Sequence, residues 1–230
     1  MIAVPPARLR RVSAEFLGSG SLTMVVVGSG IAAERLSPDD VGLQLLENAI
    51  ATALGLFVLI AVLAPVSGAH FNPVVSFVDA ALGYRSWRSI LPYLPAQVLG
   101  CVGGAVLANA MFGLAPITVS STARVSGPNL LSELVATAGL VLVIFSLARS
   151  GRAGWAPAAV GAYIGAAYFF TASTSFANPA ITVGRMFSDT FAGIHPASAP
   201  GFIAAQLAGG LFGLLLVRLL FPRRLPSERR

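Results

Sequence analysis

The sequence predicts an all-α membrane protein with six transmembrane helices and two re-entrant half-helices arranged as an inverted repeat. Of its 230 residues 56% are hydrophobic and only 10% are charged, and the mean hydropathy is +0.81. A soluble domain carries about a quarter charged residues. Six apolar stretches are long enough to span a bilayer, and two shorter ones each begin at an Asn-Pro pair. These observations indicate a multi-pass protein embedded in a lipid bilayer.

The six expected spans follow from length, because a helix needs about 20 apolar residues to cross a membrane. The candidate ranges are 12–32, 43–65, 89–112, 130–148, 154–172 and 200–221. The first follows an arginine-rich start but has no small-residue cleavage site after it. We therefore interpret it as a span and not as a removed signal peptide.

The two short apolar segments, residues 73–83 and 179–190, are predicted to be half-helices. They lie in the stretches "SGAHFNPVVSF" (67–77) and "TSFANPAITVGR" (174–185). Proline suits the first turn of a helix and asparagine suits the N-cap, so Asn72-Pro73 and Asn178-Pro179 each start a helix. A single Asn-Pro pair is more typical of a kink or a loop cap, but two at matching places favour half-helices.

The chain repeats itself in matching order. Asn72-Pro73-Val74 corresponds to Asn178-Pro179-Ala180, and an Ala-Gln-x-x-Gly pattern occurs at Gln97 and again at Gln206. Each half, residues 1–129 and 130–230, holds three spans, so the second half must insert upside down. The two halves are expected to form one pore domain, with a transport site near the bilayer midplane.

The basic residues report membrane topology. All 15 are arginine, and most lie in alternate loops or at the termini: Arg8, Arg10, Arg11, Arg85, Arg88, Arg149, Arg152, Arg223, Arg224, Arg229 and Arg230. The other loops carry only Arg35 and Arg124 outside the second Asn-Pro segment. This alternation predicts that both termini are cytoplasmic, and it makes a nucleic-acid partner unnecessary to explain the net charge of +6.

Two inverted half-helices would meet at their N-termini, each with about half a positive charge. Asn72 and Asn178 could then offer amide N–H groups to a passing solute. The preceding segments could supply a ladder of carbonyl acceptors: Gly68, Ala69, His70 and Phe71 in the first half, and Thr174, Ser175, Phe176 and Ala177 in the second. Such a track suits neutral hydrogen-bonding solutes and disfavours protons and other cations.

Glu15 and Glu133 are intramembrane carboxylates at matching places near the start of a span. Proton coupling is one interpretation, and it would make the chain an ion-coupled secondary transporter with His70 as a further candidate. A structural role, tying down the N–H groups of the loops, is favoured. Cys101 is the single cysteine, so no internal disulfide forms. No catalytic, metal or cofactor motif appears, so we expect no enzyme.

The quoted Asn-Pro segments, the early "AEFLGSG" and the paired Ala-Gln-x-x-Gly resemble the aquaporin/glycerol-facilitator (major intrinsic protein) family. The resemblance implies one pore per subunit, a homotetramer and passive, bidirectional conduction. It assigns structural support to Glu15, Glu133, Gln97 and Gln206. The family pattern is a pair of Asn-Pro-Ala motifs, here called boxes, and the first box of this chain, Asn72-Pro73-Val74, departs mildly from it at Val74.

The larger departure is Ile181, because most relatives have an arginine after Asn-Pro-Ala that forms one wall of the outer selectivity filter. Ungapped spacing carries the other filter positions to Thr52, Ala166 and Ser175. This filter would be wide and weakly charged. Arg185, whose counterpart in the first repeat is Asp79, is expected to lie too far away and to form a structural salt bridge or a surface contact.

The expected function is a broad facilitator for glycerol-like polyols, urea, water and neutral metalloid hydroxides such as arsenite. The metalloids are included among the expected solutes by analogy with a bacterial branch of the family that lacks the filter arginine. The resemblance also implies the bacterial inner (plasma) membrane. A mainly water-conducting aquaporin and, less favoured, an ion-coupled transporter remain as alternatives.

Overall fold

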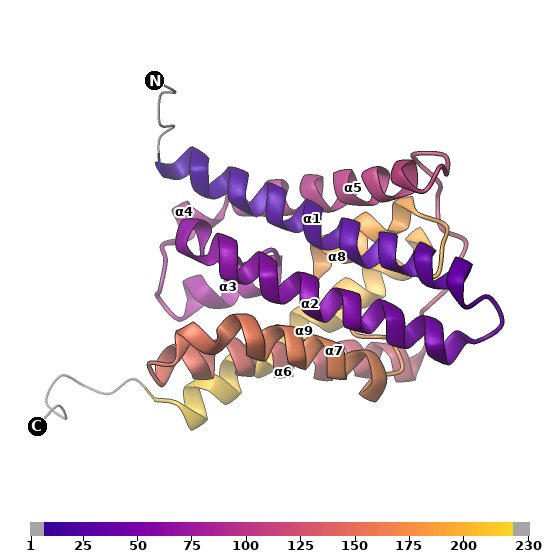
Figure 1. The fold of residues 1–230 in the computed structure, drawn as a ribbon. Helices are drawn as coiled ribbons and strands as arrows, with labels where there is room; N and C mark the ends of the chain where they lie inside the picture. The colour runs from indigo at the N-terminus through magenta and orange to yellow at the C-terminus, as the bar shows by residue number, and fades with distance from the viewer. Residues whose placement is uncertain (1–6, 223–230) are drawn as a thin grey trace, which may run out of the picture.

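The structure is a computed structural model that describes residues 7–222 as a bundle of long helices around two short ones (Figure 1). The described residues form no β-strand. The tail arginines from Arg223 onward lie outside them. The α-helices are α1 (Ala7–Leu36), α2 (Val41–Ser67), α3 (Pro73–Ala81), α4 (Trp87–Ile90), α5 (Tyr93–Met111), α6 (Gly127–Arg149), α7 (Ala156–Phe170), α8 (Pro179–Gly184) and α9 (Ala199–Leu220). Three 3₁₀ turns are η1 (Ala153–Trp155), η2 (Arg185–Phe187) and η3 (Pro196–Ser198).

Six helical segments take the places of the six expected spans. Five are long and apolar enough to cross a membrane by themselves: α1, α2, α4 with α5, α6, and η3 with α9. The sixth, α7, has 15 residues and rises about 22 Å. It is shorter than the predicted range 154–172 because its first turn follows η1 and its last residue precedes the extended Thr171. The mostly buried segment 171–178 continues from its end.

The two half-helices begin where the sequence predicts. Asn72 caps α3 by accepting a hydrogen bond from Val74 N, and Asn178 caps α8 by accepting from Ala180 N and Ile181 N. Each helix has its proline in the first turn, where no N–H is needed. The second half-helix is shorter than its predicted range 179–190, because α8 ends at Gly184 and continues only as η2.

The expected division of the chain at residues 129 and 130 falls inside α6. This helix begins at Gly127, with Ser126 as its N-cap and Pro128 in its first turn. The loop 112–126 is therefore the better boundary between the two halves. Each half contributes long helices and one half-helix, and the half-helices lie inside the bundle (Figure 1).

Close helix packing at glycine occurs in both halves. α1 packs on α5, where a Cβ on Gly100 would overlap Phe16 O and one on Gly104 would overlap Gly20 O. α6 packs on α9 in the same way, because Gly209 and Gly213 meet backbone carbonyls of α6. Small residues let the backbones of membrane helices approach closely. These two helix pairs form walls on either side of the half-helices.

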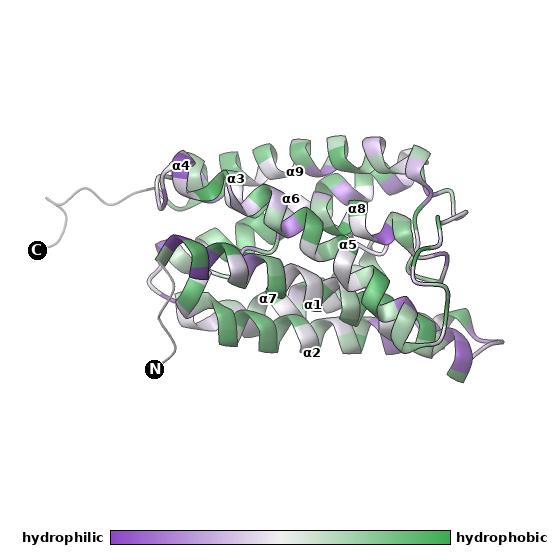
Figure 2. Cartoon of the chain, turned by 90° about the horizontal axis from the view of Figure 1, so that it is seen from above, coloured by the Kyte–Doolittle hydropathy of each residue, from purple (hydrophilic) through white to green (hydrophobic). Residues whose placement is uncertain are grey.

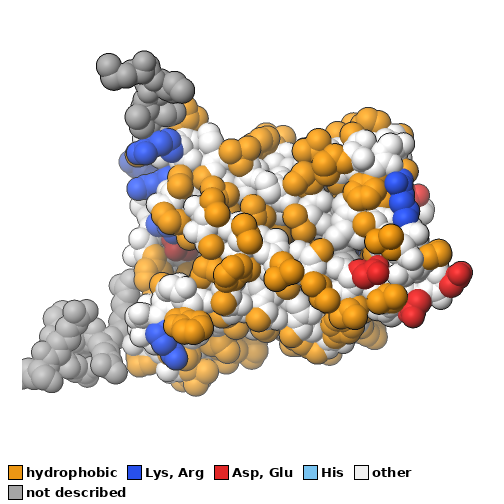
Figure 3. Space-filling model, in the orientation of Figure 1, with side chains coloured by type: hydrophobic (Ala, Val, Ile, Leu, Met, Phe, Trp, Pro, Cys, Tyr) orange, Lys and Arg blue, Asp and Glu red, His pale blue; other side chains and the backbone are white. Residues whose placement is uncertain are grey.

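The outer surface of the bundle is apolar. Large hydrophobic side chains such as Leu54, Leu99 and Leu219 are exposed on the long helices. Figure 2 shows hydrophobic residues along the helices and hydrophilic ones mainly near the two ends. Most visible arginine side chains lie at the end where α1 begins and α9 finishes, and most visible acidic ones lie at the opposite end (Figures 1 and 3). This surface suits a lipid environment.

Replacing Gly104 by alanine should lower the unfolding temperature in detergent by several degrees. The added Cβ overlaps the Gly20 carbonyl, and such overpacking costs about 1–3 kcal/mol. Gly103→Ala is the matched control, since a Cβ there meets no atom within 4 Å. Thermal unfolding followed by size-exclusion chromatography measures both variants. Equal unfolding temperatures would contradict the close contact of α1 with α5.

Candidate functional site

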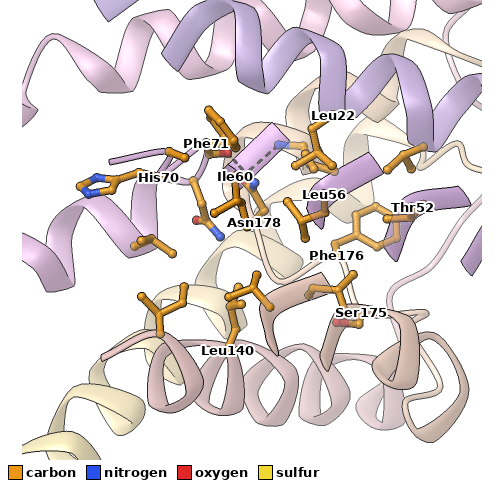
Figure 4. A pocket seen from close by; sticks show the side chains of 18 of the residues that line it. Leu22, Thr52, Leu56, Ile60, His70, Phe71, Leu140, Ser175, Phe176 and Asn178 are labelled. Atoms are coloured by element: carbon orange, nitrogen blue, oxygen red, sulfur yellow. Dashed lines mark hydrogen bonds between the residues drawn. The ribbon is translucent and has the colours of Figure 1, made fainter. Parts of the chain in front are cut away.

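The two half-helices are tied together at the centre of the bundle by their capping asparagines. Asn72 Nδ2 donates to Ala177 O at 2.7 Å, and Asn178 Nδ2 donates to Phe71 O at 2.7 Å. Figure 4 shows Phe71 and Asn178 near the middle of the site. An amide nitrogen carries two N–H groups, and the described residues provide each Nδ2 with one acceptor. Each asparagine therefore keeps one N–H for a molecule in the cavity.

The segments before both half-helices have an unusual backbone. Left-handed φ angles occur at Ala69 (51°) and Phe71 (48°), and at Thr174 (63°), Ser175 (51°) and Ala177 (48°). Non-glycine residues in this region cost about 1–3 kcal/mol each and persist only where their surroundings hold them. The two segments are thus the strained part of the site, and other groups must fix them.

Two buried glutamates hold these segments. Glu15 accepts from His70 N at 3.0 Å and from Phe71 N at 2.7 Å. Glu133 accepts from Phe176 N and Ala177 N, both at 2.8 Å. Both glutamates are completely buried, so the loop N–H groups would have no water as a substitute partner.

A glutamine steadies each carboxylate. Gln97 Nε2 donates to Glu15 Oε2 at 2.8 Å, and Gln206 Nε2 donates to Glu133 Oε2 at 2.6 Å. Ser173 Oγ adds a further bond to Glu133 at 2.6 Å. Neither glutamate lines the central cavity. The carboxylates are therefore engaged with the protein itself.

The central cavity encloses about 60 Å³ and is apolar on most sides. Its apolar wall comes from the long helices, with Leu22, Val26, Leu56, Ile60, Leu140, Ile144, Val160 and Ile164. Its polar lining includes Thr52, His70, Asn72, Tyr168, Ser175, Asn178 and Arg185. Figure 4 shows Leu56 and Leu140 around the same space as Asn178. A polar track thus runs through a hydrophobic enclosure.

A second cavity of about 740 Å³ adjoins the first and shares Ile60, Ala69 and His70 with it. Its charged lining is a cluster in which Arg85 Nη1 contacts His70 Nε2 at 2.7 Å and Asp79 Oδ1 at 3.1 Å. His70 Nδ1 also lies 3.0 Å from Ser76 Oγ. The two cavities form a route from the centre toward the arginine-rich end of the bundle.

The segments expected to form a carbonyl ladder contribute unequally to the cavity walls. Ala69, His70 and Phe71 line the central cavity, and Gly68 lines the adjoining one. From the second half, Ser175 and Phe176 line the central cavity, whereas Thr174 and Ala177 do not. The box residues Pro73, Val74, Pro179 and Ala180 are buried behind the asparagines. Val74 packs so closely on α9 that a Cβ on Gly210 would overlap its side chain.

Three of the four expected filter positions line the central cavity, namely Thr52, Ser175 and Ile181. The prediction for the fourth position, Ala166, is wrong, because this residue is exposed on the outer face of α7. Tyr168 occupies the inner face instead, and its Oη lies 3.1 Å from Thr52 Oγ1. The connection from α7 to Asn178 is thus two residues shorter than ungapped spacing assumed. Two residues turn a helix by about 200°, which exchanges its inner and outer faces.

The expectation for Arg185 is also wrong. This side chain is only 3% exposed, it lines the central cavity, and it makes no ion pair within the described residues. Its Nε donates to Ala192 O, and its guanidinium carbon lies 3.4 Å from the centre of the Phe176 ring. Spacing along a continuous helix misplaced it, because the chain leaves α8 at Gly184, which is packed tightly against Cys101.

Within residues 7–222, no group of three or more His, Cys, Asp or Glu side chains is placed to hold a metal ion. The site consists instead of hydrogen-bond donors and acceptors around a small cavity. Such an arrangement can bind and release a neutral polar molecule.

Comparison with known proteins gives consistent matches over most of the chain. The family model "Major intrinsic protein" matches residues 3–177. Aquaglyceroporin AqpS of Rhizobium meliloti (strain 1021) is 49% identical over 221 residues, which cover 96% of this chain and 94% of that protein. Aquaporin Z of Brucella melitensis biotype 1 is 28% identical over 94% of this chain and 99% of its own length. The solved aquaglyceroporin from Plasmodium falciparum has a similar fold, with a TM-score of 0.70, 21% identity, and coverage of 94% of this chain and 96% of that one.

Cysteine labelling should separate Tyr168 from Ala166. The chain's single cysteine, Cys101, is completely buried and gives little background. In proteoliposomes, Tyr168→Cys should react with the small neutral reagent 2-hydroxyethyl methanethiosulfonate about tenfold faster than Ala166→Cys, because thiols ionise poorly against lipid. Mass spectrometry of the modified protein measures both rates. Faster labelling at position 166 would contradict the orientation of α7.

Proposed function

Because the chain belongs to the major intrinsic protein family, whose members are membrane channels and not enzymes, we propose that it passes glycerol-like polyols, urea, water and neutral metalloid hydroxides such as arsenite. Conduction is passive and runs through the central cavity of each subunit. The family and the five long apolar helices make the chain a multi-pass integral membrane protein.

The observation that carries this proposal is the pair of asparagine N–H groups inside a mostly apolar cavity. A solute that crosses must exchange hydrogen bonds with water for bonds to Asn72 and Asn178. A polyol can do so, with its hydroxyl groups on the polar track and its CH groups on the leucine and isoleucine wall. An ion would lose far more hydration than this track replaces. Support for glycerol as a solute also comes from the relative named as an aquaglyceroporin.

The outer part of the cavity favours solutes larger than water. Thr52, Ser175 and Ile181 leave more room there than a ring of aromatic and histidine side chains would. Tyr168 narrows the passage compared with the alanine expected from the sequence, while its hydroxyl adds a polar contact. We infer a filter made by Thr52, Tyr168, Ser175 and Ile181 that accepts small neutral solutes of several kinds. The proposal that arsenite passes rests on the analogy with the bacterial branch of the family that, like this chain at Ile181, lacks the filter arginine.

We propose further that the protein is a homotetramer in the bacterial inner membrane, with both termini cytoplasmic. The arginine-rich end, where α1 begins and α9 finishes, supports this orientation by the positive-inside rule (Figure 3). The bacterial relative with 49% identity supports the location. The exposed apolar side chains provide surface for lipid and for neighbouring subunits.

An ion-coupled transporter is disfavoured by the bonding of its three candidate residues. Glu15 and Glu133 are engaged by loop N–H groups and glutamines, and neither lines the cavity. His70 is held between Ser76 and Arg85. A mainly water-conducting channel remains the alternative, and a comparison of solute permeabilities distinguishes it from the proposed broad facilitator.

Stopped-flow light scattering of proteoliposomes tests the proposal. Water, glycerol, urea and arsenite should all cross faster than in protein-free vesicles, and glycerol uptake should not respond to pH or sodium gradients. Ile181→Arg should reduce the passage of the larger solutes, because it fills the outer part of the cavity with a charged side chain. Permeation by water alone would contradict the broad solute range, and gradient-driven uptake would contradict passive conduction.

A further inference from the structure

Arg185 places a positive charge at the cavity without a negative partner. In residues 7–222 the two recorded ion pairs both involve Asp79, which belongs to the adjoining cavity. An unpaired charge at membrane depth is costly, and such residues face a water-filled space or mark a solute pathway. Arg185 meets this description, because it is buried and lines the central cavity.

An aromatic ring and a carbonyl fix the position of Arg185. The Phe176 ring lies 3.4 Å from the guanidinium carbon, a cation–π contact, and Ala192 O accepts from Nε. A second arginine, Arg124, lies over the same ring at 5.5 Å. Arg124 is itself held by Gly193 O and Phe191 O. The Phe176 ring is thus contacted by two arginines, and the Arg185 guanidinium is anchored beside the cavity.

The anchoring leaves hydrogen-bonding capacity unused. A guanidinium has five N–H groups, and the described part of the chain accepts only the one on Nε of Arg185. Ser175 Oγ is also buried without a hydrogen-bond partner among the described residues, and it lines the same cavity. Arg185 therefore has free donors, and Ser175 has a free hydroxyl, next to the path of a solute.

We propose that Arg185, and not residue 181, is the charged residue that determines the specificity of this channel. It repels protons and metal cations, and it donates hydrogen bonds to the oxygen atoms of neutral polyhydroxy solutes, with Ser175 Oγ as a second contact. This inference rests on the proposed channel function and names the group that gives it selectivity.

Two substitutions separate the charge from the shape of the side chain. Arg185→Gln removes the charge, so potassium and proton leak under a membrane potential should rise about tenfold or more, as expected for a unit charge several ångströms from the path. Arg185→Lys retains the charge but lacks the planar fork, so leak should stay low while glycerol uptake falls. Arg88→Gln, on the exposed surface of α4, is the matched control and should change neither rate.

The outcomes distinguish this inference from the proposed function. Wild-type protein that passes no neutral solute would overturn the channel assignment itself. Wild-type conduction combined with unchanged leak and unchanged glycerol uptake in a folded Arg185→Gln variant would overturn the role of Arg185 alone. Size-exclusion chromatography shows whether each variant is folded.

A second measurement leaves Arg185 in place and so does not depend on the folding of its variants. In Tyr168→Cys protein, the cationic reagent 2-aminoethyl methanethiosulfonate should react about tenfold more slowly than the neutral 2-hydroxyethyl reagent, after correction for their rates with a free thiol. Equal corrected rates would show that no positive charge repels cations from this part of the cavity, and they would overturn the proposal.

Discussion

The hydrogen bonds from loop N–H groups to Glu15 and Glu133 are the interactions on which the centre of this molecule depends. The segments before α3 and α8 have left-handed backbone at five non-glycine residues, and their N–H groups lie where neither water nor helix partners can reach. An ionised carboxylate can accept several such bonds, and bonds to charged groups are worth about 1.5–3 kcal/mol each. Because the carboxylates accept from the loop N–H groups, the carbonyls of Phe71 and Ala177 are not needed as their partners. These carbonyls accept instead from Asn178 and Asn72.

The inverted arrangement also distributes charge along the path. Asp79 and Arg185 follow their asparagines by the same spacing, yet Asp79 lies by the wide cavity near the arginine-rich end and Arg185 lines the narrow one. Asp79 is paired with Arg85, whereas Arg185 has an aromatic ring and a carbonyl as its contacts. The uncompensated charge is thus confined to the narrow cavity, where the surroundings screen it least.

The sequence was sufficient to predict the six spans, the two half-helices and their capping asparagines, because length, hydropathy and cap chemistry are local properties. It was insufficient at Tyr168 and Arg185. Ungapped spacing placed Ala166 at the filter. The connection after α7 is two residues shorter than that spacing assumed, so Tyr168 faces the cavity instead. Arg185 depends on the end of α8 at Gly184 and on the distant Ala192 and Phe176, and no local pattern encodes these contacts.

The most direct test of this account is the glycerol permeability of proteoliposomes that contain Glu133→Gln, measured per folded protein against Glu34→Gln. Glu34 is exposed and contacts neither half-helix, so its substitution controls for the loss of one acidic group. The amide at position 133 would turn a donor toward Phe176 N or Ala177 N, which should release the second strained segment. We predict a permeability about tenfold lower than that of the control, the factor expected from about 1.4 kcal/mol. Equal permeabilities would contradict the claim that the buried carboxylates hold the path open.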